Sequence, residues 1–254
     1  MTRIIAVASG KGGVGKTTLV SNLSAALAHF GKSVVAVDAN ITTSNLGIHL
    51  GIPLYPVTIQ DVLNGRAHLR DAVYNHKSGF RVVPADISLR KTTKLSPHNL
   101  MDTLYKFAGN SDFVLIDTAA GIGKEARMSI EAADEMLTVT NPEMPALTDA
   151  LKLSRVAEQA GTKNIGAVLN RVRGDAHEVS QERAENFLGF PIIANIPEDH
   201  AVRKSIHQKV PAVTMHPDAA ASHEFKRLAA LLSGETYTPK NAAFSFARFF
   251  SWLK

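Results

Sequence analysis

The hydrophobic positions of this chain fall into short uninterrupted runs that alternate with longer amphipathic stretches. The runs have the continuity of strands buried on both faces, at residues 3–9, 33–38, 80–84, 112–117, 135–140, 164–170 and 191–196. Helical periodicity lies between them, at residues 16–30, 97–108, 124–133, 142–160, 178–188 and 218–232. Glycines that suit helix ends follow four of these stretches, at Gly31, Gly109, Gly161 and Gly189. The alternation predicts an α/β fold, a doubly wound and mostly parallel sheet with helices on both faces.

Composition narrows the picture without naming a partner. The 254 residues are 45% hydrophobic, which is enough for one large domain over residues 1–233. The formal charge of +5 is modest and permits anionic partners without identifying one. The absence of cysteine excludes disulfides, thiolate metal sites and cysteine nucleophiles. The ten histidines show no metal-ligand spacing, and the segment 53–94 stays unassigned apart from one strand.

A glycine-rich segment stands between the first predicted strand and the first predicted helix. It reads Gly10, Lys11, Gly12, Gly13, Val14, Gly15, Lys16, Thr17 and Thr18. Such a turn lets backbone N–H groups converge on phosphate, and the helix N-terminus adds partial positive charge. Lys16 can reach the β- and γ-phosphates, and the Thr17 hydroxyl can ligate Mg²⁺ directly. An ordinary glycine-rich turn is the alternative, but the complete motif in this context predicts a P-loop ATPase that uses ATP, ADP and Mg²⁺.

Lys11 adds a feature that the general P-loop motif leaves free. With it the loop resembles the deviant Walker A motif of the ParA and MinD superfamily. The resemblance implies a homodimer that forms with ATP, in which Lys11 reaches the partner's nucleotide and stabilises charge on the transferred phosphoryl group. The alternative reading of Lys11 is a solvated loop lysine.

Two further segments resemble the switch regions of that superfamily. Asp38 ends the second predicted strand, where it can hold a magnesium-bound water or orient Lys16; a helix N-cap is its other possible role. Asn40 stands where the family usually has an acid, and an amide cannot take a proton from water, so slow hydrolysis is expected. Asp117 ends an apolar run as in a Walker B motif and would hold Mg²⁺ through water, with Gly121 suited to rearrange. The resemblance thus implies a catalytic set of Lys11, Lys16, Asp38, Asn40 and Asp117.

The resemblance also assigns a pocket for the adenine base. Asn170 matches the family's adenine-facing asparagine, with Arg171 beside it, because an amide offers both a donor and an acceptor. Pro197, Glu198 and Asp199 lie in a segment that resembles the loop closing the other side of the base; alone, each reads as a loop or cap residue. The motifs follow one another in family order over residues 1–233, and the chain resembles the archaeal-type MinD group.

The end of the chain changes character abruptly. A polar linker over residues 234–241 precedes a predicted amphipathic helix over 242–254. Phe246, Phe249, Phe250 and Leu253 share one face of that helix, and Trp252 flanks it. The helix resembles the membrane-targeting helix of MinD proteins, which implies binding to membrane lipid; a helix docked on the core is the alternative. No run of about 20 apolar residues is present, so a cytoplasmic protein, peripheral on the inner face of the cell membrane, is expected.

The function that these features imply is a MinD-like ATPase that positions or regulates an assembly such as the cell division machinery, together with an unidentified regulatory protein. The alternatives are a ParA-type ATPase that partitions DNA or other cargo, and a nucleotide-gated scaffold with little hydrolysis. The hydrophobic tail argues against the first, so nucleic acid is not expected as a partner. Asn40 gives weight to the second.

Overall fold

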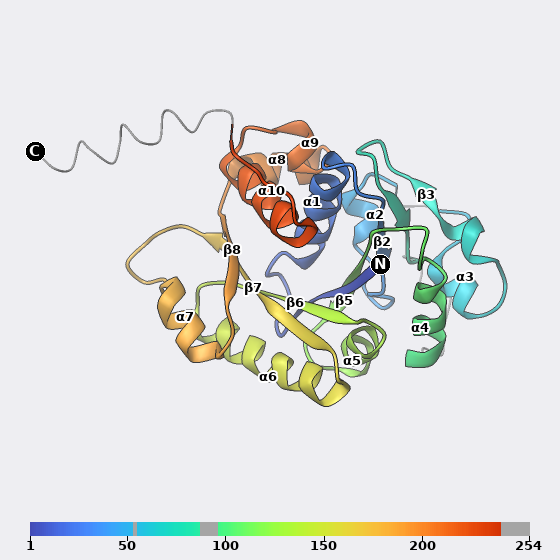
Figure 1. Ribbon diagram of the computed structural model, residues 1–254, viewed down its shortest axis with the longest axis horizontal. Helices are drawn as coiled ribbons and strands as arrows, with labels where there is room; N and C mark the ends of the chain where they lie inside the picture. The colour runs from blue at the N-terminus through green and yellow to red at the C-terminus, as the bar shows by residue number, and fades with distance from the viewer. Residues whose placement is uncertain (53–54, 87–95, 240–254) are drawn as a thin grey trace, which may run out of the picture.

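A computed structural model describes residues 1–52, 55–86 and 96–239, and the described strands form one eight-stranded sheet (Figure 1). The strand order is β3-β4-β2-β5-β1-β6-β7-β8, and every neighbouring pair is parallel except β3 and β4. The strands are β1 (Arg3–Ser9), β2 (Val34–Asp38), β3 (Tyr74–Asn75), β4 (Arg81–Val83), β5 (Phe113–Ala120), β6 (Glu135–Thr140), β7 (Lys163–Val172) and β8 (Ile192–Pro197).

Helices cover both faces of the sheet. One layer holds α1 (Lys16–His29), α2 (Leu46–His49), α8 (His200–His207), α9 (Ala212–Met215) and α10 (Ala220–Ser233). The other holds α3 (Ile59–Leu63), α4 (Pro97–Tyr105), α5 (Lys124–Glu131), α6 (Met144–Ala160) and α7 (Gln181–Leu188). Figure 1 shows the sheet between α1 and α10 above it and α5 and α6 below it. The predicted fold class is therefore confirmed.

The central strand explains why the strand runs in the sequence are continuous rather than alternating. Ile5 and Val7 of β1 pack towards α1 and α10, whereas Ile4 and Ala6 pack towards the opposite helix layer. All four side chains are buried. Since each face of the sheet needs apolar cover, both sets of positions are apolar.

The structure differs from the sequence-based expectations mainly in short elements. The segment 53–94 contains α3, the 3-10 helix η1 (Leu69–Ala72) and β3, none of which was predicted. Helix α3 begins with a capping box in which Thr58 and Asp61 exchange hydrogen bonds, so the Thr-x-x-Asp spacing was its available signal. Helices α8 and α9 occupy a region expected to be loop. Elements of four to eight residues carry too little periodicity for a reliable prediction.

Some elements end at residues other than those predicted from the sequence. Strand β5 continues to Ala120, past its expected end at Asp117, because Ala120 still pairs with Ser9 of β1. Gly161 and Gly189 end α6 and α7 in the left-handed conformation, as predicted. Helix α4 ends at Tyr105, several residues before Gly109.

The described residues after α10 lie on the domain. Gly234 ends α10 in the left-handed conformation, and Glu235 forms an ion pair with Lys32 at 2.7 Å. The Tyr237 hydroxyl lies 2.6 Å from Nδ1 of His223, and its ring meets that of Phe30 edge-on. The predicted membrane helix, with Phe246, Phe249, Phe250, Trp252 and Leu253, falls outside the described residues. Within the described ranges, none of the helices has the length and hydropathy that a membrane crossing requires.

Candidate nucleotide site

The glycine-rich segment forms a tight turn between β1 and α1. Gly15 is the N-cap of α1 with a φ of 101°, and a Cβ at this position would lie 2.2 Å from Nδ2 of Asn170. A Cβ at Gly10 would lie 2.3 Å from the carbonyl oxygen of Asp149. Both positions therefore require glycine, and the first turn of α1 carries no acidic residue to compete with an anion. The geometry suits a phosphate group at this helix N-terminus.

Lys16 points from the first turn of α1 into a buried acidic environment. Its side chain is largely buried, and burial lowers its pKa while the charges of Asp117 and Asp38 act in the opposite direction. The sheet brings these two acids together, because β2 and β5 run in parallel with Asp38 in register with Asp117. The expected grouping of Lys16, Asp38 and Asp117 is thus present.

Asp38 is fully buried and is held by hydrogen bonds from the loop that follows it. Its carboxylate accepts from the Ser44 hydroxyl at 2.7 Å, from the backbone N–H of Leu46 at 3.1 Å and from that of Asn40 at 3.1 Å. Burial, and then the charge of Asp117, raise the pKa of Asp38 to about 7. Leu46 is the first residue of α2, but the N-cap of that helix is Asn45, so Asp38 binds the start of α2 without being the N-cap that its alternative role predicted.

Asp117 is also fully buried, yet neither of its carboxylate oxygens has a hydrogen-bond partner in the described part of the chain. Burial raises its pKa to about 6, although the Thr17 side chain and the charge of Lys16 act in the opposite direction. Buried polar atoms without partners need an explanation, and anionic oxygens beside a threonine hydroxyl are the ligand type that Mg²⁺ prefers. The donor set therefore fits a magnesium ion with its bound waters.

Asn40 does not extend freely into the site. Its Nδ2 donates to the carbonyl oxygen of Thr43 at 2.7 Å, and its Oδ1 accepts from the Thr43 hydroxyl at 2.9 Å. The side-chain amide therefore closes the loop that follows β2. Both residues line the cavity that also holds Lys16 and Thr17.

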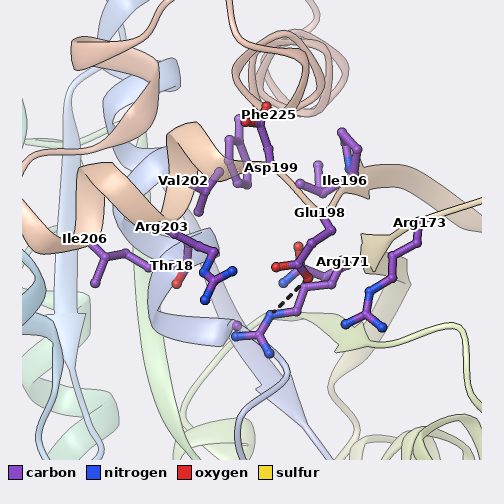
Figure 2. Close-up of a pocket in the computed structure, with 13 residues that line it drawn as sticks. Thr18, Arg171, Arg173, Ile196, Glu198, Asp199, Val202, Arg203, Ile206 and Phe225 are labelled. Carbon is purple, nitrogen blue, oxygen red and sulfur yellow. Dashed lines mark ion pairs between the residues drawn. The ribbon is translucent and has the colours of Figure 1, made fainter.

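Two neighbouring cavities share lining residues and together form one groove. The first, about 310 Å³ in volume, lies between the end of β7 and α8 (Figure 2). The second lies over the phosphate loop. Gly15, Thr18, Arg171 and Ile206 line both cavities. Their continuity places the predicted base pocket at one end of the groove and the predicted phosphate site at the other.

The predicted base-pocket residues do meet at the first cavity. Asn170 donates from Nδ2 to the carbonyl oxygen of Val14 at 2.6 Å, which ties the end of β7 to the phosphate loop. Arg171 has a φ of 59°, and its Nε lies 3.9 Å from Oε2 of Glu198 (Figure 2). Pro197 ends β8 beside them.

Asp199 lines the same cavity, but its carboxylate is occupied. Oδ1 accepts from the backbone N–H of Ala201 at 2.8 Å, so Asp199 caps α8. Oδ2 accepts from the N–H of Ala221 in α10 at 3.1 Å. Asp199 therefore has the cap role that was its alternative reading, and it joins two helices.

Some lining residues had not been identified from the sequence. Arg203 and Ile206 belong to α8, and Figure 2 shows Arg203 reaching towards Arg171. His49 at the end of α2 lies with Nε2 3.4 Å from the Thr18 hydroxyl. The amphipathic pattern that begins at residue 200 was the available signal for α8; nothing in the sequence pointed to His49.

Lys11 contrasts with Lys16. It is solvent-exposed, and no ion pair joins it to another described residue. Its backbone is fixed, because the Ser9 hydroxyl donates to its carbonyl oxygen at 2.7 Å. The loop thus presents the Lys11 ammonium group to solvent, without an ion-pair partner among the residues that the structure describes.

Comparisons with known proteins agree with this geometry. Residues 5–212 match the CobQ/CobB/MinD/ParA nucleotide-binding domain. The chain is 41% identical to an uncharacterised ATP-binding protein of Methanocaldococcus jannaschii, over 93% of this chain and 90% of that protein. MinD of Pyrococcus horikoshii, solved in complex with Mg-ADP, is 36% identical with a TM-score of 0.87, over 91% and 96% of the two chains. MinD in the MinC:MinD cell division protein complex of Aquifex aeolicus is 31% identical with a TM-score of 0.82, over 94% and 98%. The chain therefore belongs to the CobQ/CobB/MinD/ParA nucleotide-binding family, and its similarity to MinD-type ATPases confirms the resemblance seen in its motifs.

Proposed function

We propose that this protein is an ATPase that binds ATP with Mg²⁺, dimerises around the nucleotide and then associates peripherally with a membrane. In that state it would position or regulate an assembly such as the cell division machinery. The observation that carries the proposal is the pair of lysines in one loop: Lys16 is buried against two acids, whereas Lys11 is exposed and unpaired among the described residues. The exposed Lys11 suits contact with a nucleotide that is bound to another copy of the chain.

The phosphate end of the groove supplies most of the proposed binding energy. The backbone N–H groups of residues 10–18 would surround the phosphates, and Lys16 would contact the β- and γ-phosphates. Thr17 would ligate Mg²⁺, and Asp38 and Asp117 would hold it through water. When bound, Mg²⁺ neutralises charge on the phosphate oxygens. Mg-ADP in the Pyrococcus MinD supports ATP, ADP and Mg²⁺ as the cofactors.

The base end of the groove supplies specificity. One N–H of the Asn170 amide is used by the Val14 carbonyl oxygen, so its Oδ1 and its second N–H are left to accept from and donate to the adenine edge. Arg171 and Glu198 lie beside it as an ion pair, and Pro197 and Asp199 complete the wall by packing and backbone. The side chain of Asp199 contributes to this wall indirectly, because it caps α8 and so holds that helix beside the cavity.

Lys11 provides the direct test of the dimer. With ATP and Mg²⁺, light scattering should give the mass of two chains for the wild type and of one chain for Lys11→Ala. Hydrolysis should fall by about 10³-fold, the contribution of a charge supplied in trans. ATP affinity of the single chain should stay within a few-fold. Lys163→Ala, an exposed lysine at the start of β7, is the matched control and should behave as wild type. A Lys11→Ala protein that dimerises with ATP would remove the lysine from the interface.

Slow hydrolysis is part of the proposal. Asn40 cannot act as a base, and its amide is engaged with Thr43, so the ATP-bound dimer would persist. The same observation favours a second candidate, a nucleotide-gated scaffold with little turnover. A single-turnover measurement with radiolabelled ATP separates the two, because a scaffold would release ATP before cleaving it.

Membrane association rests on the tail predicted at residues 242–254. A helix this short is marginal in water, and two copies in a dimer would raise membrane avidity by roughly 10²-fold or more. ATP would therefore favour a peripheral location on the inner face of the cell membrane. The MinC:MinD complex of Aquifex supports a regulatory protein as a further partner.

Vesicle co-sedimentation tests the membrane step. Deleting residues 242–254 should abolish ATP-dependent binding to anionic vesicles while ATP binding survives. Pelleting that is unaffected by the deletion would assign the tail a structural role instead.

A further inference from the structure

One carboxylate joins the two loops that flank the phosphate end of the groove. Glu125 lies in the first turn of α5, directly after the 121–123 turn that follows β5. Its Oε1 accepts from the backbone N–H groups of Ile41 and Thr42, the latter at 3.0 Å. Its Oε2 accepts from the Thr42 hydroxyl at 2.8 Å. A single side chain thus makes three hydrogen bonds to a loop 83 residues away in sequence.

These two loops contact the same space. The loop after β2 contributes Asn40 and Thr43 to the phosphate cavity, and β5 contributes Ala120 at its end. Gly121, with a φ of 85°, donates from its N–H to the carbonyl oxygen of Ser9 at the start of the phosphate loop. Because both loops line the same cavity, a rearrangement of one loop around a phosphate can affect the other loop.

The position of Glu125 suits this contact better than an ordinary surface role. The charge lies near the N-terminus of α5, where the helix dipole stabilises an anion. Gly123, the N-cap, provides no side-chain cap, and Glu125 forms no ion pair within the described residues. Its carboxylate is instead satisfied by the facing loop, and charge-assisted bonds of this kind are stronger than neutral ones.

We propose that Glu125 is a positioning residue that fastens residues 41–42 to α5, so that the loop after β2 and the turn after β5 respond to nucleotide as one unit. The inference rests on the proposed ATP-dependent switch. Through Glu125, a change in the backbone at Gly121 on phosphate binding would be transmitted to the loop that holds Asn40. This transmission would not require a direct contact between Gly121 and Asn40.

Single-residue hydrogen exchange by NMR, first without nucleotide, tests the connection itself. In Glu125→Ala the amides of Ile41 and Thr42 should exchange about tenfold faster or more, because their acceptor is gone. Glu125→Gln keeps one acceptor oxygen and should be intermediate. Glu131→Ala removes the same charge from the exposed end of the same helix and should match wild type. Equal exchange in Glu125→Ala and wild type would overturn the proposal.

The coupling is tested by adding Mg²⁺ and a non-hydrolysable ATP analogue. In wild type, residues 40–45 and 121–125 should gain protection together; in Glu125→Ala only the second segment should respond. A merely structural role would lower protection without separating the two responses. If both segments of Glu125→Ala respond as in wild type, the coupling is refuted. If wild type responds in neither segment, the ATP switch and its coupling both fail, while the nucleotide-free exchange still reports the connection.

Discussion

Three charged side chains meet in the interior of the nucleotide site. Asp38 and Asp117 lie in register on adjacent strands, and Lys16 is the basic residue whose charge acts on them. Burial raises the pKa of both acids. Their ionised forms are therefore less favourable in the folded protein than in the unfolded chain when no metal is bound, which lowers the stability of the fold. The site is therefore built for an additional cation, at the expense of stability in its absence.

Asp117→Asn should make the nucleotide-free protein more stable at neutral pH. The pKa of Asp117 is raised to about 6 from an ordinary value of 3.8, so between these values the folded state binds more protons than the unfolded state. Stability then falls as pH rises through this window. Removing the carboxylate should raise the free energy of unfolding by roughly 1–2 kcal/mol at pH 8 and by much less at pH 4.5.

Thermal unfolding from pH 4.5 to 8 measures this difference. Asp102→Asn on the exposed side of α4 is the control and should show no such pH dependence relative to wild type. A constant difference between Asp117→Asn and wild type at every pH would contradict the assignment. Loss of stabilisation by Mg-ATP in the same variant would independently support the magnesium role.

Asn40→Asp should increase ATP turnover, because a carboxylate can orient and deprotonate water where an amide cannot. General-base catalysis typically contributes about 10²-fold or more. The variant also loses the bond from Nδ2 to Thr43, which should cost about 1 kcal/mol of stability without nucleotide. Phosphate release under saturating ATP measures the rate.

Asn45→Asp is the matched control for that experiment. Asn45 also donates to the Thr43 carbonyl oxygen, at 2.8 Å, and lines the same cavity. The Asn45→Asp substitution introduces the same negative charge into the same loop as Asn40→Asp. Equal rates for Asn40→Asp and wild type would remove Asn40 from the catalytic account.

Among the described helices, α8 is followed by a non-glycine residue in a strained backbone conformation. Lys209 follows its C-cap with a φ of 57°, in the left-handed region that favours glycine. Its N–H donates to Ile206 at 3.1 Å and that of Val210 to Ser205 at 3.1 Å, which is the Schellman pattern. A lysine thus occupies a position that favours glycine, at the end of the helix that lines the predicted base pocket.

Lys209→Gly should stabilise the protein by about 1 kcal/mol, because glycine adopts this conformation without steric cost. Urea unfolding measures the change. Lys209→Ala keeps the Cβ and therefore should not gain stability, which separates the backbone effect from loss of the charge. A Lys209→Gly protein no more stable than Lys209→Ala would contradict the assignment of backbone strain to this position.

At the scale of the whole molecule, the end of the described chain is fastened to the domain at two points. Glu235 pairs with Lys32, and Tyr237 packs against Phe30 and His223. The first contact joins the segment after α10 to the loop that follows α1, and the second joins it to the C-cap of α1 and to α10. The described part of the chain is therefore held on the domain as far as Tyr237.

Two truncations should therefore differ sharply. A chain ending at residue 241 should keep the melting temperature of the full protein and its affinity for ATP. A chain ending at residue 233 loses both contacts and should be destabilised by roughly 1–3 kcal/mol, or about 2–10 °C for a domain of this size. Calorimetry measures both. Identical melting temperatures would show that the contacts contribute nothing to stability.

Most of the strands, the longer helices and the phosphate loop could be predicted from local sequence patterns. Each of these depends on neighbours in the chain: strand and helix periods are local, and the N–H groups around phosphate come from nine consecutive residues. Asp117 and Asn170 could also be named from their resemblance to family motifs. For Asp38 that resemblance was joined by the argument that strand ends at the carboxyl edge of such a sheet face the nucleotide.

Tertiary structure alone decided how those residues interact. The register of β2 with β5 set Asp38 beside Asp117, and Asn170 found its acceptor in Val14, 156 residues earlier. Helix α8 closed the base pocket, and Glu125 joined the two loops. Such contacts depend on strand order and on short elements held by packing rather than by their own propensity, so no local pattern encodes them.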